Sequence, residues 1–176
     1  LDGKTALNNG VSQWITGSDA RRDGHAWRAR ACAILTGIGT VRDDDPQLLV
    51  RDVETTRQPL RVVVDSRFEI PLTARILQGG PVLLVGAVEN AEKIQMLRSA
   101  GNFVEILKNP AGKVDLKALL ELLAQRGINE VHAEAGFKLN GSLMREGLVD
   151  ELLLYLAPCL IGHDASGLFN LPELTT

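Results

Sequence analysis

The sequence predicts an α/β domain built on a largely parallel sheet. Short apolar segments alternate along the chain with segments in which apolar residues recur at helical spacing, which is typical of a parallel sheet covered by helices. Hydrophobic residues make up 45% and charged residues 23% of the 176 residues. These proportions are ordinary for one soluble globular domain with a sizeable core.

The first 65 residues contain one predicted helix and three predicted strands. Residues 1–7 have the character of a strand end. Hydroxyl groups and Asp19 suit the first turn of a helix that covers about residues 16–31. Residues 32–35 and 60–65 are largely apolar, and the second run is rich in valine, so both predict buried strands.

Strands and helices continue to alternate after residue 80. Each predicted helix ends at a glycine, because glycine readily adopts the left-handed conformation that closes a helix. The predicted helices cover residues 90–100, 115–126 and 138–146. The predicted strands cover residues 81–86, 103–107, 130–134 and 151–156.

Composition argues against several classes of partner. The formal net charge is −3 and no block of lysine and arginine stands out, so nucleic acid is not expected as a partner. No apolar run approaches the roughly 20 residues that a membrane span needs, so no membrane partner is expected. Cys32 and Cys159 lie in apolar sequence and predict two buried thiols in a reducing, cytoplasmic compartment. The histidines and cysteines lack metal-ligand spacing, so no metal is predicted.

Both ends of the chain are abrupt. The sequence starts at Leu1 without a methionine and stops at Thr176, shortly after a leucine-proline pair. We therefore expect residues 1–176 to form one domain taken from a longer polypeptide, with structure missing on both sides.

Three predicted strands end in polar or glycine-rich sequence, and ligands of parallel sheets bind at such carboxyl ends. Residues 36–40 carry two glycines, residues 65–67 carry a serine and an arginine suited to a phosphate, and residues 134–136 join a carboxylate to a glycine turn. Each segment also fits an ordinary turn. Trp14 likewise suits either stacking on a flat ring or packing in the core.

Three consecutive acids follow the first of these strand ends. Asp43 suits a solvated surface, Asp45 suits a turn before Pro46, and Asp44 lies between the glycine-rich segment and Arg51. On composition alone, a solvated acidic loop and a functional segment are equally good interpretations.

An ordered set of short motifs carries a resemblance that covers essentially the whole chain. The motifs are LDGKTA at 1–6, SQWIT at 12–16, AIL and TV at 33–35 and 40–41, DDP with a leucine and an arginine at 44–51, VDS at 64–66, EAG at 134–136 and GLVDE at 147–151. In this order they resemble the reductase domain of the bacterial bifunctional riboflavin-biosynthesis deaminase/reductase. The resemblance implies a dihydrofolate-reductase-like α/β fold, with a mostly parallel mixed sheet flanked by helices on both faces.

The resemblance also implies a reaction and its partners. NADPH would reduce C1 of the ribose of 5-amino-6-(5-phosphoribosylamino)uracil to give the ribitylamino product. The zinc deaminase half of that family's protein is absent from these 176 residues. We expect this domain to be fused to such a deaminase in the full-length protein, and we expect a homodimer.

Residue by residue, the resemblance places the family's substrate contacts on Ser12, Arg28, Leu48, Arg51 and Glu134. Arg28 and Arg51 are expected to clamp the substrate phosphate from two sides. Opening of the ribose leaves an alkoxide that needs a proton. Asp44 is preferred among the three candidate catalytic groups, which are Lys4, Asp44 and Glu134.

The family's cofactor contacts fall on several segments. Ser66, helped by Arg67, is expected to bind the 2′-phosphate that distinguishes NADPH from NADH. Phe137 and Lys138 stand where the family more often has small or hydroxyl residues. The resemblance therefore indicates which cofactor binds more clearly than how tightly it binds. The complete set is Thr5, Trp14, Thr40, Asp44, Ser66, Arg67, Gly136, Phe137, Lys138, Leu139, Asn140, Gly141 and Ser142.

Two other functions fit the same residues. One is the same fold reducing the pyrimidine before its deamination, or reducing a pterin. The other is a module that binds NADPH or a phosphosugar without catalysis. Three ionisable groups in a buried site argue against the second function, because binding alone does not require Lys4, Asp44 and Glu134 together.

Overall fold

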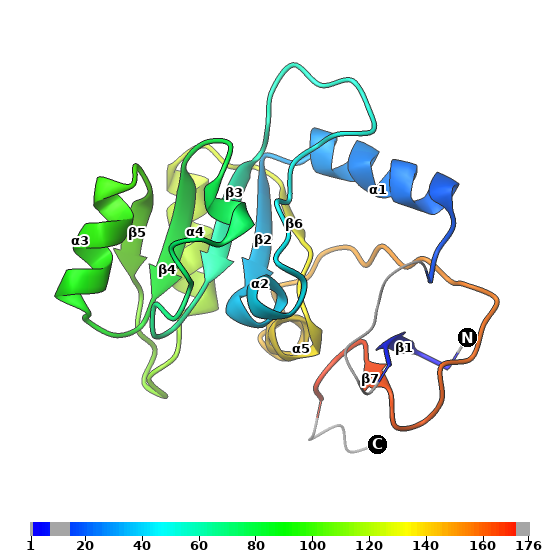
Figure 1. Cartoon of the computed structure of the whole chain (residues 1–176). Coiled ribbons are helices and arrows are strands. Elements are labelled where there is room, and N and C mark those ends of the chain that lie inside the picture. Colours follow the sequence, from blue (N-terminus) through cyan, green and yellow to red (C-terminus); the bar gives the residue numbers. More distant parts are fainter. Residues whose placement is uncertain (1, 8–14, 172–176) are drawn as a thin grey trace.

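The computed structural model describes residues 2–7 and 15–171 (Figure 1). Its helices are α1 (Ser18–Arg30), α2 (Ile38–Asp44), α3 (Ala91–Ser99), α4 (Leu116–Gln125) and α5 (Phe137–Arg145), with a 3-10 turn η1 at Arg75–Leu77. Its strands are β1 (Lys4–Ala6), β2 (Ala33–Gly37), β3 (Leu60–Val64), β4 (Val82–Gly86), β5 (Phe103–Ile106), β6 (Val131–Ala133) and β7 (Ser166–Gly167).

Five strands form the main sheet in the order β5-β4-β3-β2-β6, and each pairing in it is parallel. The chain passes from β2 through β3 and β4 to β5 in one direction, and β6 then returns to the other side of β2. The strand order therefore reverses between β2 and β6, which is where ligands bind in sheets of this kind. The antiparallel pair β1–β7 forms a separate sheet, on the side of β6 and far from β5 (Figure 1).

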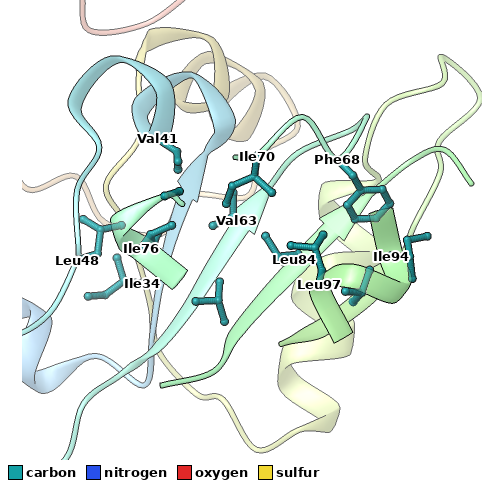
Figure 2. Close-up of a cluster of buried hydrophobic side chains, with 13 residues drawn as sticks. Ile34, Val41, Leu48, Val63, Phe68, Ile70, Ile76, Leu84, Ile94 and Leu97 are labelled. Carbon is teal, nitrogen blue, oxygen red and sulfur yellow. The ribbon is translucent and has the colours of Figure 1, made fainter. Parts of the chain in front are cut away.

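Helices cover both faces of the main sheet, as predicted, and each face has its own core. Neighbouring strand residues point to opposite faces, so Ile34 packs on one side and Leu35 on the other. The first core joins the sheet to α2 and α3, and Figure 2 shows its side chains, among them Val41, Val63, Leu84 and Leu97. The second core joins the opposite face to α4 and α5 through residues such as Leu83, Leu119 and Leu143.

The ends of the later helices follow the signals in the sequence. The side chains of Asn90 and Asp115 cap α3 and α4 by accepting hydrogen bonds from backbone N–H groups one turn later, at 3.1 and 2.9 Å. Gly101, Gly127 and Gly147 follow the three helices with φ of 84°, 77° and 66°, which glycine adopts without strain. The predicted capping residues and terminating glycines are therefore confirmed.

The strand predicted over residues 151–156 is wrong. This segment has no regular secondary structure and joins neither sheet. Leu152, Leu154 and Leu156 are 54%, 44% and 68% exposed. An apolar run becomes a strand only where a neighbouring strand supplies partners for its backbone N–H and C=O groups, and sequence spacing does not reveal that neighbour.

Two further predictions differ from the structure. Residues 38–44 form helix α2, where the sequence predicts a turn and an acidic loop; packing of Val41 in the first core stabilises the helix despite its glycine. Cys32 is half-buried and Cys159 is exposed, so the predicted pair of buried thiols is wrong. Within the described ranges, no helix has the length and apolar character needed to cross a bilayer.

Candidate active site

The point where the strand order reverses lies between the carboxyl ends of β2 and β6. Helices α2 and α5 follow these strands and pack on opposite faces of the sheet. Their first residues nevertheless lie close together. A Cβ added to Gly136 would be 3.7 Å from the Thr40 hydroxyl oxygen, and one added to Gly37 would be 3.4 Å from the Leu139 side chain. Two predicted cofactor contacts, Thr40 and Gly136, therefore meet at this point.

Both of these helices begin without a capping side chain. Their N-cap residues are Gly37 and Gly136, whereas the N-cap side chains of α3 and α4 accept hydrogen bonds from first-turn N–H groups. The start of α5 therefore keeps its first-turn N–H groups available, and Lys138 adds a positive charge in the same turn. Such a set of donors suits the pyrophosphate of a dinucleotide.

Arg28 and Glu134 form a two-point ion pair at the carboxyl end of β6. Nε and Nη2 of Arg28 donate to the two carboxylate oxygens of Glu134 at 2.5 and 2.6 Å. The two side chains are only 17% and 26% exposed, so water screens them less than it screens a surface pair. The Thr36 hydroxyl holds the backbone of Glu134 in place by donating a hydrogen bond to its carbonyl oxygen at 2.7 Å. His132 Nε2 lies 3.5 Å from the same carboxylate.

The segment that begins at Leu48 is held beside this pair. Leu48 is buried in the left-handed conformation, with φ of 51°. Arg28 Nη1 donates to the Leu49 carbonyl at 3.3 Å. The side-chain amide of Gln58 then pairs with both backbone groups of Val50, at 2.8 and 3.1 Å. Several side chains, rather than a sheet ladder, thus fix the path of this segment.

Arg51 comes next, and its backbone N–H donates to Nδ1 of His25 at 3.4 Å. The Arg51 side chain is exposed, so its guanidinium is accessible to a ligand. The structure thus brings together four of the five predicted substrate contacts, namely Arg28, Leu48, Arg51 and Glu134. The fifth, Ser12, and the predicted cofactor contact Trp14 lie outside the described residues.

Asp44, the preferred proton donor of the sequence prediction, is the last residue of α2 and is exposed. It lies four residues after Thr40, so both side chains fall on the same face of the helix. Asp45 follows in the left-handed conformation, with φ of 39°, and its carboxylate accepts the Arg75 N–H at 2.8 Å. The predicted turn-forming role of Asp45 is confirmed.

Ser66 and Arg67 lie at the carboxyl end of β3, next to β2. The buried Asp65 holds this turn, because its carboxylate accepts a backbone N–H five residues later at 2.8 Å. Arg67 Nη1 lies 4.0 Å from Glu69, which also pairs with Arg42 of α2. Ser66 and Arg67 therefore lie at the same edge of the sheet as the start of α2, and Arg42 adds a second cation there.

Lys4 and Thr5 lie in β1, outside the main sheet. The Lys4 ammonium donates to two backbone carbonyls just before β7, at 2.8 and 2.9 Å, and so helps to hold the two short strands together. The expectation that Lys4, Asp44 and Glu134 share a buried site is wrong, because Asp44 is exposed and the other two are half-buried.

Residues 137–145 form helix α5, close to the helix predicted over residues 138–146. Leu139 packs against the second core, and Gly141 lies against Asn170, where an added Cβ would be 2.3 Å from the carbonyl oxygen. Nearby backbone carbonyls accept hydrogen bonds from the side chains of Asn140 and Ser142. Residues 136–138, at the start of the helix, are exposed.

Sequence reasoning missed His25, the buried residue of α1. Its Nε2 lies 3.3 Å from the Asp52 carboxylate. Burial lowers the pKa of His25 below its ordinary value of 6.5, and the positive charges of Arg28 and Arg51 act in the same direction. The spacing of three residues between His25 and Arg28 was a usable signal, because it places both on one face of a helix.

Two further features border this region. The Tyr155 hydroxyl donates to the Asp23 carboxylate at 2.5 Å and ties the segment after α5 to α1. Burial and this hydrogen bond raise the pKa of Tyr155 to about 12, so the phenol stays a donor at neutral pH. In the parts of the chain that the structure describes, no group of three or more His, Cys, Asp or Glu side chains is arranged to hold a metal ion.

The family model of the RibD C-terminal domain matches residues 1–176. The chain belongs to the RibD C-terminal domain family. The riboflavin biosynthesis protein RibD of Escherichia coli (strain K12) is 40% identical over 188 aligned residues, which cover 99% of this chain and 50% of the relative. The chain thus spans about half the length of the curated RibD relatives it matches.

Solved RibD structures share the fold of this RibD C-terminal domain. Acinetobacter baumannii RibD gives a TM-score of 0.83 at 42% identity, over 97% of this chain and 47% of that one. A Thermotoga maritima diaminohydroxyphosphoribosylaminopyrimidine deaminase/5-amino-6-(5-phosphoribosylamino)uracil reductase gives 0.65 at 28% identity, over 83% of this chain and 39% of that one. The predicted family and its dihydrofolate-reductase-like α/β fold are confirmed.

Proposed function

We propose that this domain catalyses the NADPH-dependent reduction of C1 of the ribose in 5-amino-6-(5-phosphoribosylamino)uracil. Membership of the RibD C-terminal domain family supports this, and the Thermotoga maritima relative bears the name of that reductase. The observation that carries the proposal is the Arg28–Glu134 pair. It adjoins the Arg51 segment on one side and the start of α5 on the other, so a sugar phosphate and a dinucleotide would meet at Glu134.

Arg51 is the group proposed to bind the substrate phosphate. Its guanidinium is exposed, and its planar fork of donors matches a phosphate. Arg28 takes a different role from the one expected of it, because Nε and Nη2 bind Glu134 and Nη1 binds the Leu49 carbonyl. We assign Arg28 first to orienting Glu134 and only second to the phosphate.

Glu134 is the group proposed to handle the proton. The ribose must open before its C1 can be reduced, and opening transfers a proton to the ring oxygen. Glu134 is half-buried, oriented by Arg28 and within 3.5 Å of His132, with which it can exchange a proton. Asp44 is the alternative, although it is exposed. Lys4 is the least suited of the three, because its ammonium already binds two carbonyls.

The cofactor is proposed to lie along the carboxyl edge of β3, β2 and β6. The first turn of α5, with Lys138 and the neighbouring Thr40 hydroxyl, would hold the pyrophosphate. Ser66 and Arg67 would bind the 2′-phosphate, with Arg42 as a second cation. When bound, NADPH would supply the hydride for the ribose carbon.

Steady-state kinetics of the full-length protein test these assignments, with NADPH oxidation followed by the absorbance of the reduced nicotinamide. Arg51→Ala should raise KM for the substrate about tenfold or more and leave kcat within about threefold. Glu134→Gln should lower kcat by about 10²- to 10⁴-fold, because it removes a proton-transferring group. Arg30→Ala is the matched control, since Arg30 pairs with Glu130 at the exposed end of α1 and both constants should stay within about twofold.

Other outcomes of the same assay point to the other candidate functions. Turnover of the pyrimidine before its deamination, or of a pterin, in preference to the uracil would assign the domain to a different substrate. NADPH binding by calorimetry with no turnover of any aminopyrimidine would assign it to binding without catalysis. Full activity of Glu134→Gln would transfer the proton role to Asp44.

We also propose that the full-length protein carries a zinc deaminase domain and forms a homodimer. The curated relatives are about twice as long as this chain, and the Thermotoga maritima relative is named for both activities. Zinc analysis and sedimentation of the full-length protein test the two statements separately. A monomer without zinc would contradict both.

A further inference from the structure

His25 is placed where it can fix the backbone of Arg51. It is 7% exposed, on a helix whose other side chains are exposed or half-buried. A buried imidazole needs polar partners for its two ring nitrogens, since an unpaired buried nitrogen is costly. Both nitrogens have such a partner, and the two partners are consecutive residues.

The contacts of His25 define its protonation state. Nδ1 accepts the backbone N–H of Arg51 at 3.4 Å, and Nε2 lies 3.3 Å from the Asp52 carboxylate. Nδ1 accepts only in the neutral ring, which places the proton on Nε2, toward Asp52. One side chain therefore holds residue 51 by its backbone and residue 52 by its side chain.

The neighbours of Arg51 in the chain show why this contact matters. Leu49 and Val50 are held by Arg28 and Gln58, but residues 51–59 have no regular secondary structure. The hydrogen bond from the Arg51 N–H to His25 therefore holds the next residue of this segment, whose guanidinium is exposed.

We propose that His25 is a positioning residue for the substrate phosphate: it acts through Arg51, by holding the Arg51 backbone in the orientation that presents the guanidinium to the ligand. This inference rests on the proposed role of Arg51. His25 itself does not touch the ligand.

Burial and the surrounding charges favour the neutral imidazole of His25, whose Nδ1 can accept a hydrogen bond. Burial lowers the pKa of His25 most, followed by the charge of Arg28 on the same helix, and Arg51 acts in the same direction. Asp52 and Glu134 act in the opposite direction without reversing the shift. The ring is therefore neutral at pH 7, as the contact with Arg51 requires.

A double-mutant cycle between His25 and Arg51 tests the proposal in the full-length protein. The measured quantities are KM and kcat for the aminopyrimidine substrate, and Kd for ribose 5-phosphate by calorimetry. His25→Ala should raise KM and Kd roughly five- to tenfold, as expected for one lost hydrogen bond that orients the arginine, and leave kcat within about twofold. In the Arg51→Ala background, His25→Ala should add less than about twofold, because two residues that act through one group are not additive.

Two more variants separate positioning from a general loss of stability. His25→Gln keeps one acceptor and one donor and should recover most of the affinity for ribose 5-phosphate. Asn102→Ala is the matched control. Asn102 is also buried, at 6% exposure, but its side chain forms hydrogen bonds with the backbone of Val82 and Leu97, in β4 and α3. It should destabilise the protein and leave KM unchanged. The Kd for NADPH should be the same in all variants.

Each outcome decides the proposal. An unchanged Kd for ribose 5-phosphate in His25→Ala, or additive effects in the double variant, would overturn it. If His25→Ala does not fold, His25→Leu fills the same space without ring nitrogens and replaces it in the cycle. Failure of the proposed function looks different, because the wild type would then show no turnover or Arg51→Ala would leave the Kd for ribose 5-phosphate unchanged.

Discussion

At the scale of single residues, the candidate site is built from pairs that lie far apart in the sequence. Arg28 and Glu134 are 106 positions apart, and His25 and Arg51 are 26 positions apart. Each pair joins a side chain on α1 to a distant part of the chain: Glu134 directly follows β6, and Arg51 follows Val50, which Gln58 holds just before β3 begins. Replacing Arg28 or Glu134 leaves the other charge without its partner at a place that water reaches poorly, which is more damaging than loss of a surface charge.

The neutral state of His25 predicts a specific dependence of stability on pH. Its pKa in the folded protein lies below the ordinary value of 6.5, so the unfolded chain binds a proton more readily than the folded one. The contribution of His25 to stability should therefore be fully present above about pH 6.5 and be lost as pH falls toward its folded pKa.

Urea unfolding of the wild type and of His25→Gln over this pH range measures that contribution. Glutamine does not titrate. As pH falls, the free energy of unfolding of the wild type should therefore decrease more than that of His25→Gln. Parallel pH curves for the two proteins would show that His25 does not titrate in this way.

At the scale of elements, helix α5 combines two tasks. Its first turn faces the start of α2, where the dinucleotide is proposed to bind, and its middle packs closely against the segment at Asn170. Gly141 makes this packing possible, because a Cβ there would lie 2.3 and 2.8 Å from backbone atoms of Asn170. The glycine at position 141 is therefore explained by packing between two segments rather than by contact with a ligand.

Replacing Gly141 with alanine should destabilise the protein by about 1–3 kcal/mol, since the helix or the facing backbone must shift. This loss should appear although alanine is the better helix former. Gly24→Ala in α1 is the matched control: no atom lies within 4 Å of the added Cβ, so stability should stay the same or rise by up to about 1 kcal/mol. Free energies from urea unfolding compare the two, and equal effects would contradict the packing argument.

At the scale of the whole molecule, two cores on opposite faces hold the sheet and thereby the site. The second core includes Leu119 of α4, which is fully buried against the face that also carries α5. Loss of packing there would loosen the helix whose first turn is proposed to bind the cofactor. Stability of this core and the geometry of the site are thus connected through α5.

Leu119→Ala should lower the free energy of unfolding by about 2–5 kcal/mol, because it leaves a cavity in a fully buried position. Leu72→Ala is the matched control, because it makes the same leucine-to-alanine change at a side chain that is 47% exposed. It should change the free energy of unfolding by less than about 0.5 kcal/mol. Denaturation in urea measures both. A comparable loss of stability in the two variants would contradict the argument that burial of Leu119 determines its contribution.

The sequence by itself determined the local features of this protein and its family. Short apolar runs predicted the five strands of the main sheet, and Asn90, Asp115 and the terminating glycines predicted the helix ends. The ordered motifs predicted the RibD C-terminal domain family. They also led to five expected substrate contacts, four of which lie near one another in the structure. These features were readable because caps, turns and side-chain periodicity depend on residues within one or two turns of one another.

Only the tertiary structure decided how these parts combine. It left the leucine-rich run at 151–156 outside both sheets, formed α2 through the packing of Val41, and separated Lys4 from the main sheet. It also bound Arg28 to Glu134 and buried His25 beside Arg51. Each of these outcomes depends on a partner distant in the sequence, and local spacing carries no information about which distant partner a backbone or side chain will meet.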